Sequence, residues 1–231
     1  AVASGLGRVT LVGSETTVGA QLDAIGATQS DALNIADPDT SPLTAQMADT
    51  YFELRKHKGV TREQAARQAR NPLNFAAMLV RLDHADGTVG GAVSTTSDTV
   101  RAALQIIGKA PGSALVSSFF LMALPAGHPS GRDAMIFSDC GLVIDPTAPE
   151  LAAIAAQSAV SCRALIGADP KVAMLSFSTK GSAHHRAVTK VTDALDLLHA
   201  AHPELAADGE LQFDTAFVPD VAATKAKGSK V

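Results

Sequence analysis

The segment "KVAMLSFSTKGSAHHRAVTKVTDALDLLHAA" (residues 171–201) decides the fold class of this chain. It begins with a short apolar run, Lys171–Ser176, which is typical of a buried β-strand. A loop of small polar residues and two adjacent histidines follows, and Ala187–Ala201 then carries leucines at helical spacing. A buried strand that leads through a polar loop into an amphipathic helix indicates an α/β protein.

The same alternation of strands and helices extends over the rest of the chain. We expect further strands at Arg8–Gly13, Ala32–Asp37, Asp86–Val93, Ala114–Leu124, Ala134–Phe137 and Gly209–Phe213. The expected helices are Thr16–Ile25, two or three pieces between Leu43 and Asp83, Ser97–Ile107, Thr147–Ile166 and Asp214–Thr224. The Pro/Gly-rich turn at 125–132 predicts that the strands beside it are antiparallel.

Several residues mark where these elements begin and end. Ser14, Ser97 and Thr147 are candidate helix caps, and Glu150 stands at the capping-box distance from Thr147. Gly59 and the Asn71-Pro72 pair predict breaks in the long helical region. The turn signal Asp37-Pro38-Asp39 closes the second strand.

The segment "GKAPGS" (Gly108–Ser113) is the best candidate for a domain boundary. We expect a first α/β domain at 1–112 and a second at 113–231, each with helices on both faces of a sheet. Ligands of such sheets bind beyond the carboxyl ends of the strands. The loops after Val93 and Ser176 are therefore the places where a site is expected.

Composition excludes several classes of function. The 231 residues carry a net charge of −4 and contain no dense run of Lys and Arg, which argues against nucleic acid as a partner. The longest apolar runs are shorter than a membrane span, and the start, Ala1 rather than Met, does not resemble a signal peptide. Cys140 and Cys162 form no CxxC pattern, so we expect a reduced, cytoplasmic protein without membrane contact.

The segment "GGAVSTTSDTVR" (Gly90–Arg101) suits a phosphate group. Glycines let the backbone approach closely, hydroxyls and the N–H groups of a helix start donate, and Arg101 adds positive charge. It is neither a Walker A loop nor a GxGxxG fingerprint. From local chemistry alone, an ordinary capped helix start explains the segment equally well.

Two other polar segments also have alternative interpretations. "LRKHKG" (Leu54–Gly59) places cations at a helix C-terminus, which local chemistry favours over an anchor for a polyanionic ligand. In "SFSTKGSAHH" (Ser176–His185), two adjacent histidines lack the spacing of a metal site, and the GxSxG nucleophile motif is absent. A cradle for an anion or acyl phosphate, with Lys180 available, fits this loop better than a metal.

Five long segments, in the same order, resemble the phosphotransacetylase family, which contains phosphate acetyltransferases and the related phosphate butyryltransferases. They are "YFELRKHKGVTREQA", "ADGTVGGAVSTTSDTVRAALQIIG", "DCGLVIDPTAPELAAIAAQSA", "PKVAMLSFSTKGSAHH" and "DGELQFDTAFVPDVAATKAKGSKV". The resemblance covers nearly the whole chain and is far more specific than any single motif above.

The resemblance implies two three-layer α/β domains of the isocitrate/isopropylmalate dehydrogenase-like type, with a cleft between them, in a homodimer. It implies the reversible reaction of acetyl-CoA and phosphate to acetyl phosphate and CoA. The mechanism that the resemblance implies is direct attack of the CoA thiol on the acyl phosphate, in a ternary complex. Coenzyme A is then a substrate, and neither a metal nor a tightly bound cofactor is expected.

Residue by residue, the resemblance assigns CoA-phosphate binding to Arg55 and Arg101. The hydroxyl loop Ser94–Thr99, with Thr96 and Thr99, resembles the wall beside them. The resemblance assigns the opposite wall, facing the acyl phosphate, to the loop residues Ser178, Thr179, Lys180, Gly181 and Ser182.

The family's late segment of the form "RKPVNDLSRG" is absent from these residues. That segment carries the arginine and aspartate to which the family's catalysis is attributed, and it completes the first domain. A short N-terminal piece of the family pattern is also missing. We therefore expect the catalytic residues beyond Val231 and predict that residues 1–231 alone are inactive and poorly stable.

Two rival functions stay open at this point. One is a phosphate butyryltransferase, with the same chemistry on a longer acyl group. The other is a non-catalytic acyl-CoA-sensing domain, as in some malic enzymes. "STTSDTVR" and "SFSTKGSAHH" are more similar to the catalytic branch of the family.

Overall fold

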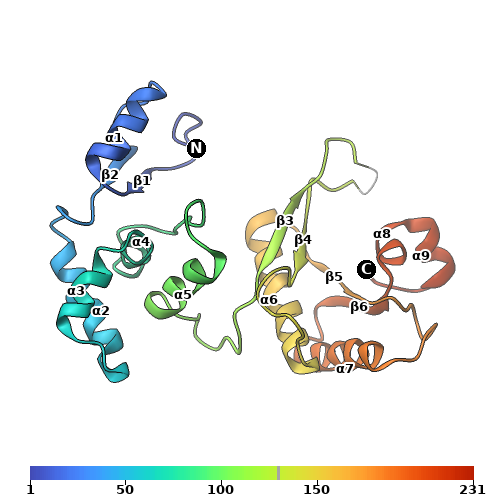
Figure 1. The fold of residues 1–231 in the computed structure, drawn as a ribbon. Coiled ribbons are helices and arrows are strands. Elements are labelled where there is room, and N and C mark those ends of the chain that lie inside the picture. The colour runs from blue at the N-terminus through green and yellow to red at the C-terminus, as the bar shows by residue number, and fades with distance from the viewer. Residues whose placement is uncertain (129–130) are drawn as a thin grey trace. The chain divides into compact units, whose positions relative to one another are not determined.

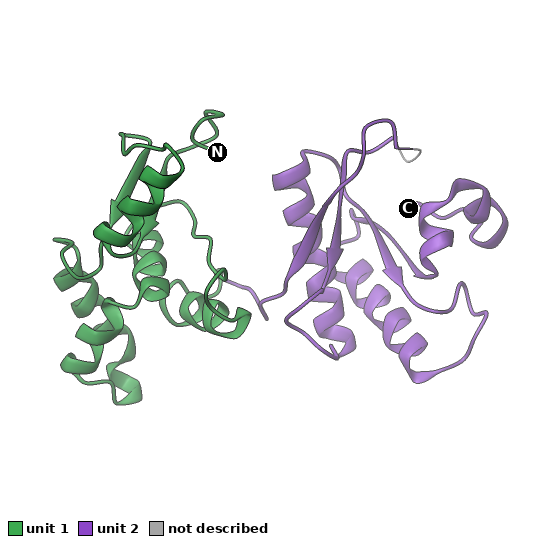
Figure 2. Ribbon diagram, turned by 45° about the horizontal axis from the view of Figure 1, so that its top comes forward, with its two compact units in different colours: residues 1–110 green, residues 111–231 purple. Residues whose placement is uncertain are grey.

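The computed structural model of the protein describes residues 1–128 and 131–231. The chain forms two compact units, residues 1–110 and residues 111–231 (Figure 2). The division falls inside the segment Gly108–Ser113. Glycine and proline in this segment interrupt regular structure between α5 (Thr96–Ile106) of the first unit and the strands of the second.

The first unit begins with a parallel strand pair (Figure 1). β1 (Val9–Val12) lies beside β2 (Leu33–Ala36), with α1 (Glu15–Ala24) as the crossover between them. The side chain of Ser14 makes no capping bond to α1. Instead, the backbone N–H of Glu15 donates to the carboxylate of Asp37 at 3.0 Å, which also accepts from the N–H of Asp39 at 2.9 Å.

Helices make up the rest of the first unit: α2 (Thr44–Arg55), the 3-10 helix η1 (Lys56–Lys58), α3 (Arg62–Ala69), α4 (Pro72–Arg81) and α5 (Thr96–Ile106). The predicted breaks are confirmed. Gly59 takes the left-handed conformation at the end of η1, and Asn71 caps α4 through bonds from the N–H groups of Leu73 and Asn74. The core of these helices contains Met47, Tyr51, Phe75, Met78 and Ile106.

The strand expected at Asp86–Val93 is wrong. These residues form no strand, and the side chains of Val89 and Val93 are fully exposed. A glycine-rich segment has few side chains to pack against a neighbouring strand, so its apolar residues alone do not define one. The cap of α5 is Thr95 rather than Ser97, because the Thr95 hydroxyl accepts from the N–H of Asp98 at 3.1 Å.

In the second unit, β3 (Phe119–Ala123) pairs with β4 (Ala134–Ser138) in antiparallel register, with Phe119 opposite Ser138. This confirms the predicted antiparallel pair, although β3 is shorter than the expected strand Ala114–Leu124. The predicted turn at 125–132 includes residues 129 and 130, which lie outside the described residues.

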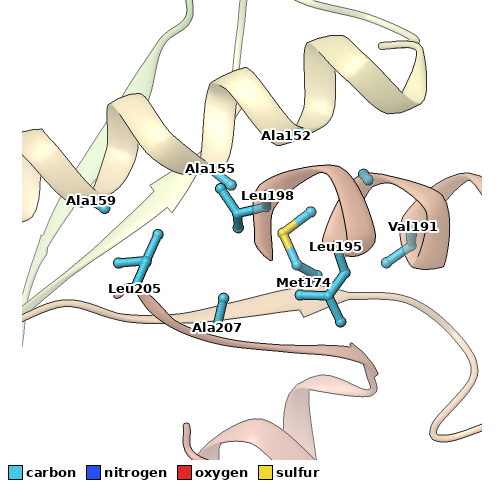
Figure 3. Close-up of a cluster of buried hydrophobic side chains, with 10 residues drawn as sticks. Ala152, Ala155, Ala159, Met174, Val191, Leu195, Leu198, Leu205 and Ala207 are labelled. Atoms are coloured by element: carbon cyan, nitrogen blue, oxygen red, sulfur yellow. The ribbon is translucent and has the colours of Figure 1, made fainter. Parts of the chain in front are cut away.

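A second parallel pair forms the centre of this unit. β5 (Lys171–Leu175) lies beside β6 (Ala206–Leu211), with α7 (Arg186–Ala201) as the crossover. α6 (Ala148–Ile166) packs along α7 and begins with the predicted capping box, because the N–H and hydroxyl of Thr147 both donate to Glu150 at 2.8 Å. Figure 3 shows side chains from α6, α7, the two strands and the residue before β6 meeting in one core: Ala152, Ala155, Ala159, Met174, Val191, Leu195, Leu198, Leu205 and Ala207.

The end of the chain differs from its prediction. β6 begins at Ala206 rather than at Gly209, and the single expected helix is two short ones, α8 (Phe213–Phe217) and α9 (Pro219–Lys225). Pro219 has no backbone N–H and forces Val218 into an extended conformation (φ −102°, ψ 113°), which ends α8.

The described residues thus have a mixed α/β fold with three two-stranded sheets. In this part of the chain we find no helix whose length and apolar character would allow it to cross a membrane.

Candidate functional site

An open pocket of about 460 Å³ lies on the first unit, where α2 ends and α5 begins. α2 contributes Arg55. The other lining residues share one face of α5, since they are spaced at i, i+3, i+4, i+7 and i+8: Ser97, Val100, Arg101, Leu104 and Gln105. The structure therefore brings together the two arginines that the sequence predicted to bind phosphate, because Arg55 at the end of α2 and Arg101 on α5 line the same pocket.

Arg55 has an unsatisfied donor at this pocket. Its Nε is buried and has no hydrogen-bond partner among the described residues. A buried donor without a partner is costly, and native structures usually pair such groups. An anionic ligand oxygen is a chemically suitable partner for this guanidinium.

Arg101 shares its charge with an internal carboxylate. Its Nη1 donates to Oδ1 of Asp98 at 2.8 Å, and both side chains are about half exposed. The Thr95 hydroxyl donates to the other oxygen of Asp98 at 2.7 Å. This bond, together with the charge of Arg101, holds the pKa of Asp98 below its usual range.

The two predicted threonines have other positions. Neither Thr96 nor Thr99 is among the described residues that line the pocket. The Thr99 hydroxyl donates to the carbonyl of Thr95 at 3.1 Å, and its methyl group faces Gly90, where an added Cβ would lie 3.4 Å away. Sequence reasoning placed Ser97 in the hydroxyl loop beside the arginines but missed Gln105 as a pocket residue. The spacing of four residues between Arg101 and Gln105 on a helix is the signal that could have found it.

The second candidate region is the loop after β5, at the carboxyl end of the β5–β6 pair. Ser178 and Thr179 are buried in it, whereas Lys180, Gly181 and Ser182 are exposed. The five predicted residues therefore divide into an inward and an outward group. Residues 208–212, at the end of β6 and just after it, contact the loop: Glu210 bonds to the inward residue Ser178, and Gln212 bonds to Thr179.

Glu210 is the centre of these contacts. Its Oε1 accepts from the N–H of Gly181 at 2.7 Å and from the hydroxyl of Ser178 at 2.9 Å. The glutamate side chain is only 3% exposed. Burial by itself raises the pKa of Glu210, but the bonds from Gly181 and Ser178 outweigh it, and the pKa lies below its usual range.

The remaining contacts tie the loop to the same segment. The Lys180 ammonium donates to the carboxylate of Asp208 and to the carbonyl of Gly209. The Thr179 hydroxyl accepts from the N–H of Gln212 at 2.9 Å, and the Ser182 hydroxyl accepts from the N–H of Thr179 at 3.0 Å. Sequence reasoning treated this part of β6 only as a strand. The sequence signal that could have pointed to Glu210 is a charged residue inside an expected strand.

The two histidines belong to the start of α7. Nδ1 of His185 accepts from the N–H of Ala187 at 3.1 Å, and its ring meets Phe177 edge-on at 6.0 Å between centroids. His184 is exposed. Over residues 1–128 and 131–231, no group of three or more His, Cys, Asp or Glu side chains is arranged to hold a metal ion.

The family described as phosphate acetyl/butaryl transferase matches residues 1–231. The chain belongs to this family. The resemblance seen in the sequence is thereby confirmed, and the relatives are named as an acyltransferase enzyme, phosphate acetyltransferase.

Among the relatives of this family member, the phosphate acetyltransferase of Paracoccus denitrificans is 50% identical over 228 residues, which cover 99% of this chain and 68% of the relative. That of Clostridium acetobutylicum is 44% identical, covering 100% of this chain and 69% of the relative. Among solved structures, the EutD phosphotransacetylase from Staphylococcus aureus matches with a TM-score of 0.84 and 41% identity, covering 97% of this chain and 66% of that one. The chain thus spans about two thirds of the length of these family members.

Proposed function

We propose that this chain is part of a phosphate acetyltransferase, which transfers an acetyl group reversibly between coenzyme A and inorganic phosphate. The observation that carries the proposal is the pocket lined by both Arg55 and Arg101, with a buried guanidinium donor that has no partner within the part of the chain that the structure describes. The names of the relatives support the same reaction.

Coenzyme A is the ligand proposed for this pocket. Its phosphates suit the two guanidinium groups, and its adenine ring suits the apolar side chains of Val100 and Leu104 on the same face of α5. Ser97 and Gln105 add hydrogen-bonding groups. A pocket that combines cations with a few apolar side chains fits a nucleotide better than it fits free phosphate.

In the proposed reaction, the CoA thiol loses its proton to a base and its sulfur attacks the carbonyl carbon of acetyl phosphate. The new carbon–sulfur bond forms as the carbon–oxygen bond to phosphate breaks, and inorganic phosphate leaves with the electron pair. Cations and hydroxyls stabilise the charge that develops on the leaving group. We assign no catalytic base within residues 1–231, because the family segment that carries it has no match in this sequence.

We further propose that the exposed side of the loop after β5, with Lys180, Gly181 and Ser182, faces the acyl phosphate. This arrangement requires two domains of the isocitrate/isopropylmalate dehydrogenase-like type, 1–112 and 113–231, with the substrates in a cleft between them. We also propose a homodimer in the cytoplasm, with no tightly bound cofactor and with no nucleic acid or membrane as partner.

The test is an assay of the full-length gene product that carries these residues, with acetyl phosphate and CoA as substrates. R55A and R101A are expected to raise the KM for CoA about tenfold or more each, because each removes a charge-assisted bond to phosphate. R62A is the matched control, since Arg62 lies outside the pocket and pairs with Asp49 at 3.0 Å.

Two further outcomes separate the rival functions. Faster turnover with butyryl phosphate than with acetyl phosphate would identify the enzyme as a phosphate butyryltransferase. Binding of acetyl-CoA without any thioester formation would overturn the enzyme and favour an acyl-CoA-sensing domain.

A further inference from the structure

The loop after β5 holds an anion that belongs to the chain itself. Its inward donors, the N–H of Gly181 and the hydroxyl of Ser178, both bond to Oε1 of Glu210. A loop of this composition was expected to cradle phosphate with these groups. Because a buried carboxylate already occupies them, they are not available to a substrate.

Glu210 orders most of the loop through a short series of hydrogen bonds. Ser178, which donates to Glu210, in turn accepts from the N–H of Ala183 at 3.0 Å. The hydroxyl of Ser178 is also 3.2 Å from that of Ser182. The backbone carbonyl of Glu210 accepts from the N–H of Lys180 at 3.1 Å. The contacts of Glu210 therefore reach from Ser178 to Ala183.

The loop conformation needs such support. Lys180 and Gly181 both have positive φ, at +48° and +81°. Glycine adopts this region freely, whereas lysine does so at a cost that surrounding contacts must offset. Glu210 supplies contacts to both residues, because its carboxylate accepts from the N–H of Gly181 and its backbone carbonyl accepts from the N–H of Lys180. In this conformation Lys180, Gly181 and Ser182 are exposed.

We propose that Glu210 is a positioning residue for the acyl phosphate. It does not touch the substrate. It holds the Ser178–Ala183 loop from behind, so that the exposed groups of the loop meet the phosphoryl oxygens in a fixed geometry. The inference rests on the proposed function, because it concerns the same loop and the same reaction.

Two substitutions in the full-length protein separate the hydrogen bonds from the charge. Both loop bonds end on Oε1, so the single carbonyl oxygen of glutamine can accept both, whereas alanine can accept neither. We expect E210A to raise the KM for acetyl phosphate about tenfold or more and to leave the KM for CoA within about twofold. E210Q is expected to restore the KM for acetyl phosphate to within about threefold of the wild type.

L198A is the control for a general loss of stability. Leu198 is buried in the core of the same unit, on α7 and outside the loop. We expect L198A to lower the melting temperature without changing the KM for acetyl phosphate. An equal rise of that KM in L198A and E210A would overturn the positioning role.

Hydrogen exchange tests the loop without relying on activity. The amides of Gly181 and Ala183 are expected to exchange about tenfold faster in E210A than in the wild type, and at wild-type rates in L198A under conditions where it is fully folded. Unchanged exchange in E210A overturns the inference and leaves the proposed function intact. No acetyl transfer by the wild-type protein overturns the proposed function instead, and with it the substrate assigned to the loop.

Discussion

The guanidinium of Arg101 is bonded to the carboxylate of Asp98 at 2.8 Å, one turn earlier on α5. Arg101 also lines the pocket proposed for coenzyme A. A phosphate in that pocket therefore competes with an internal carboxylate for the same cation. The second unit has a similar pair, because Lys180, in the loop proposed to face the acyl phosphate, is already paired with Asp208.

Removal of the competing charge is expected to strengthen coenzyme A binding. In D98N, Arg101 loses an exposed ion pair of modest strength, so the KM for CoA should fall by about two- to fivefold at low salt. Steady-state kinetics of the full-length protein measure this. E63Q breaks a comparable exposed pair with Arg67 outside the pocket and should leave the KM unchanged. A higher KM in D98N would mean that Asp98 supports the site rather than competing with it.

Gly209 is required by the close approach of β5 and β6. A Cβ at this position would lie 2.7 Å from Cβ of Met174 and 2.9 Å from its carbonyl oxygen. We expect G209A to force the two strands apart and to lower the free energy of unfolding by about 1–3 kcal/mol. Thermal or urea denaturation provides the measurement. G141A is the control in the same unit, since its Cβ would meet only Oγ of Ser118 at an ordinary 3.6 Å.

Asp139 connects the ends of the β3–β4 hairpin. Its carboxylate accepts from the N–H and hydroxyl of Ser118 at 2.7 and 2.8 Å, and from the N–H groups of Gly141 and Leu142 at 2.8 and 2.9 Å. Partial burial raises the pKa of Asp139, but these bonds together outweigh it and hold the pKa well below its usual range.

This depressed pKa predicts how stability depends on pH. The stabilisation is fully present above the ordinary aspartate pKa of about 3.9 and is lost as the pH falls through the lower pKa of the folded state. D139N should cost about 1–3 kcal/mol of unfolding free energy at neutral pH, and the gap to the wild type should shrink below about pH 4. Urea titrations at several pH values test this, with the exposed Asp133→Asn as control. A gap that widened on acidification would contradict the assignment.

The histidine pair should divide into one structural and one dispensable residue. H185A removes the cap on the N–H of Ala187 and is expected to cost about 1 kcal/mol, whereas H185N keeps an acceptor at the cap and should recover most of it. H184A is the matched control, because His184 is exposed and adjacent. Equal losses in H184A and H185A, measured by denaturation, would argue against the capping role.

Local patterns predicted most of the elements. The capping box of Thr147 and Glu150, the break at Asn71-Pro72 and the strand β5 each depend on residues close together in the chain, and each is present. The errors also have local causes. Valines in the segment Asp86–Val93 suggested a strand that no neighbour pairs with, and Pro219 divides a helix that apolar periodicity predicted as one.

The site was predictable in part. The two arginines fall on one pocket, as their residue type suggested, but the threonines beside Arg101 do not, because helical geometry turns Thr99 towards Gly90. Thr99 stands two residues before Arg101, and residues two apart on a helix do not share a face.

The sequence by itself determined the strand–loop–helix units and the family, because both depend on short-range patterns and on long stretches of matching residues. Only the tertiary structure decided the direction of the loop after β5. Ser178 and Glu210 are 32 residues apart in the chain, and they meet because β5 and β6 pair in parallel. That pairing places a buried carboxylate behind the loop and leaves its outer side exposed, which no pattern within the loop could reveal.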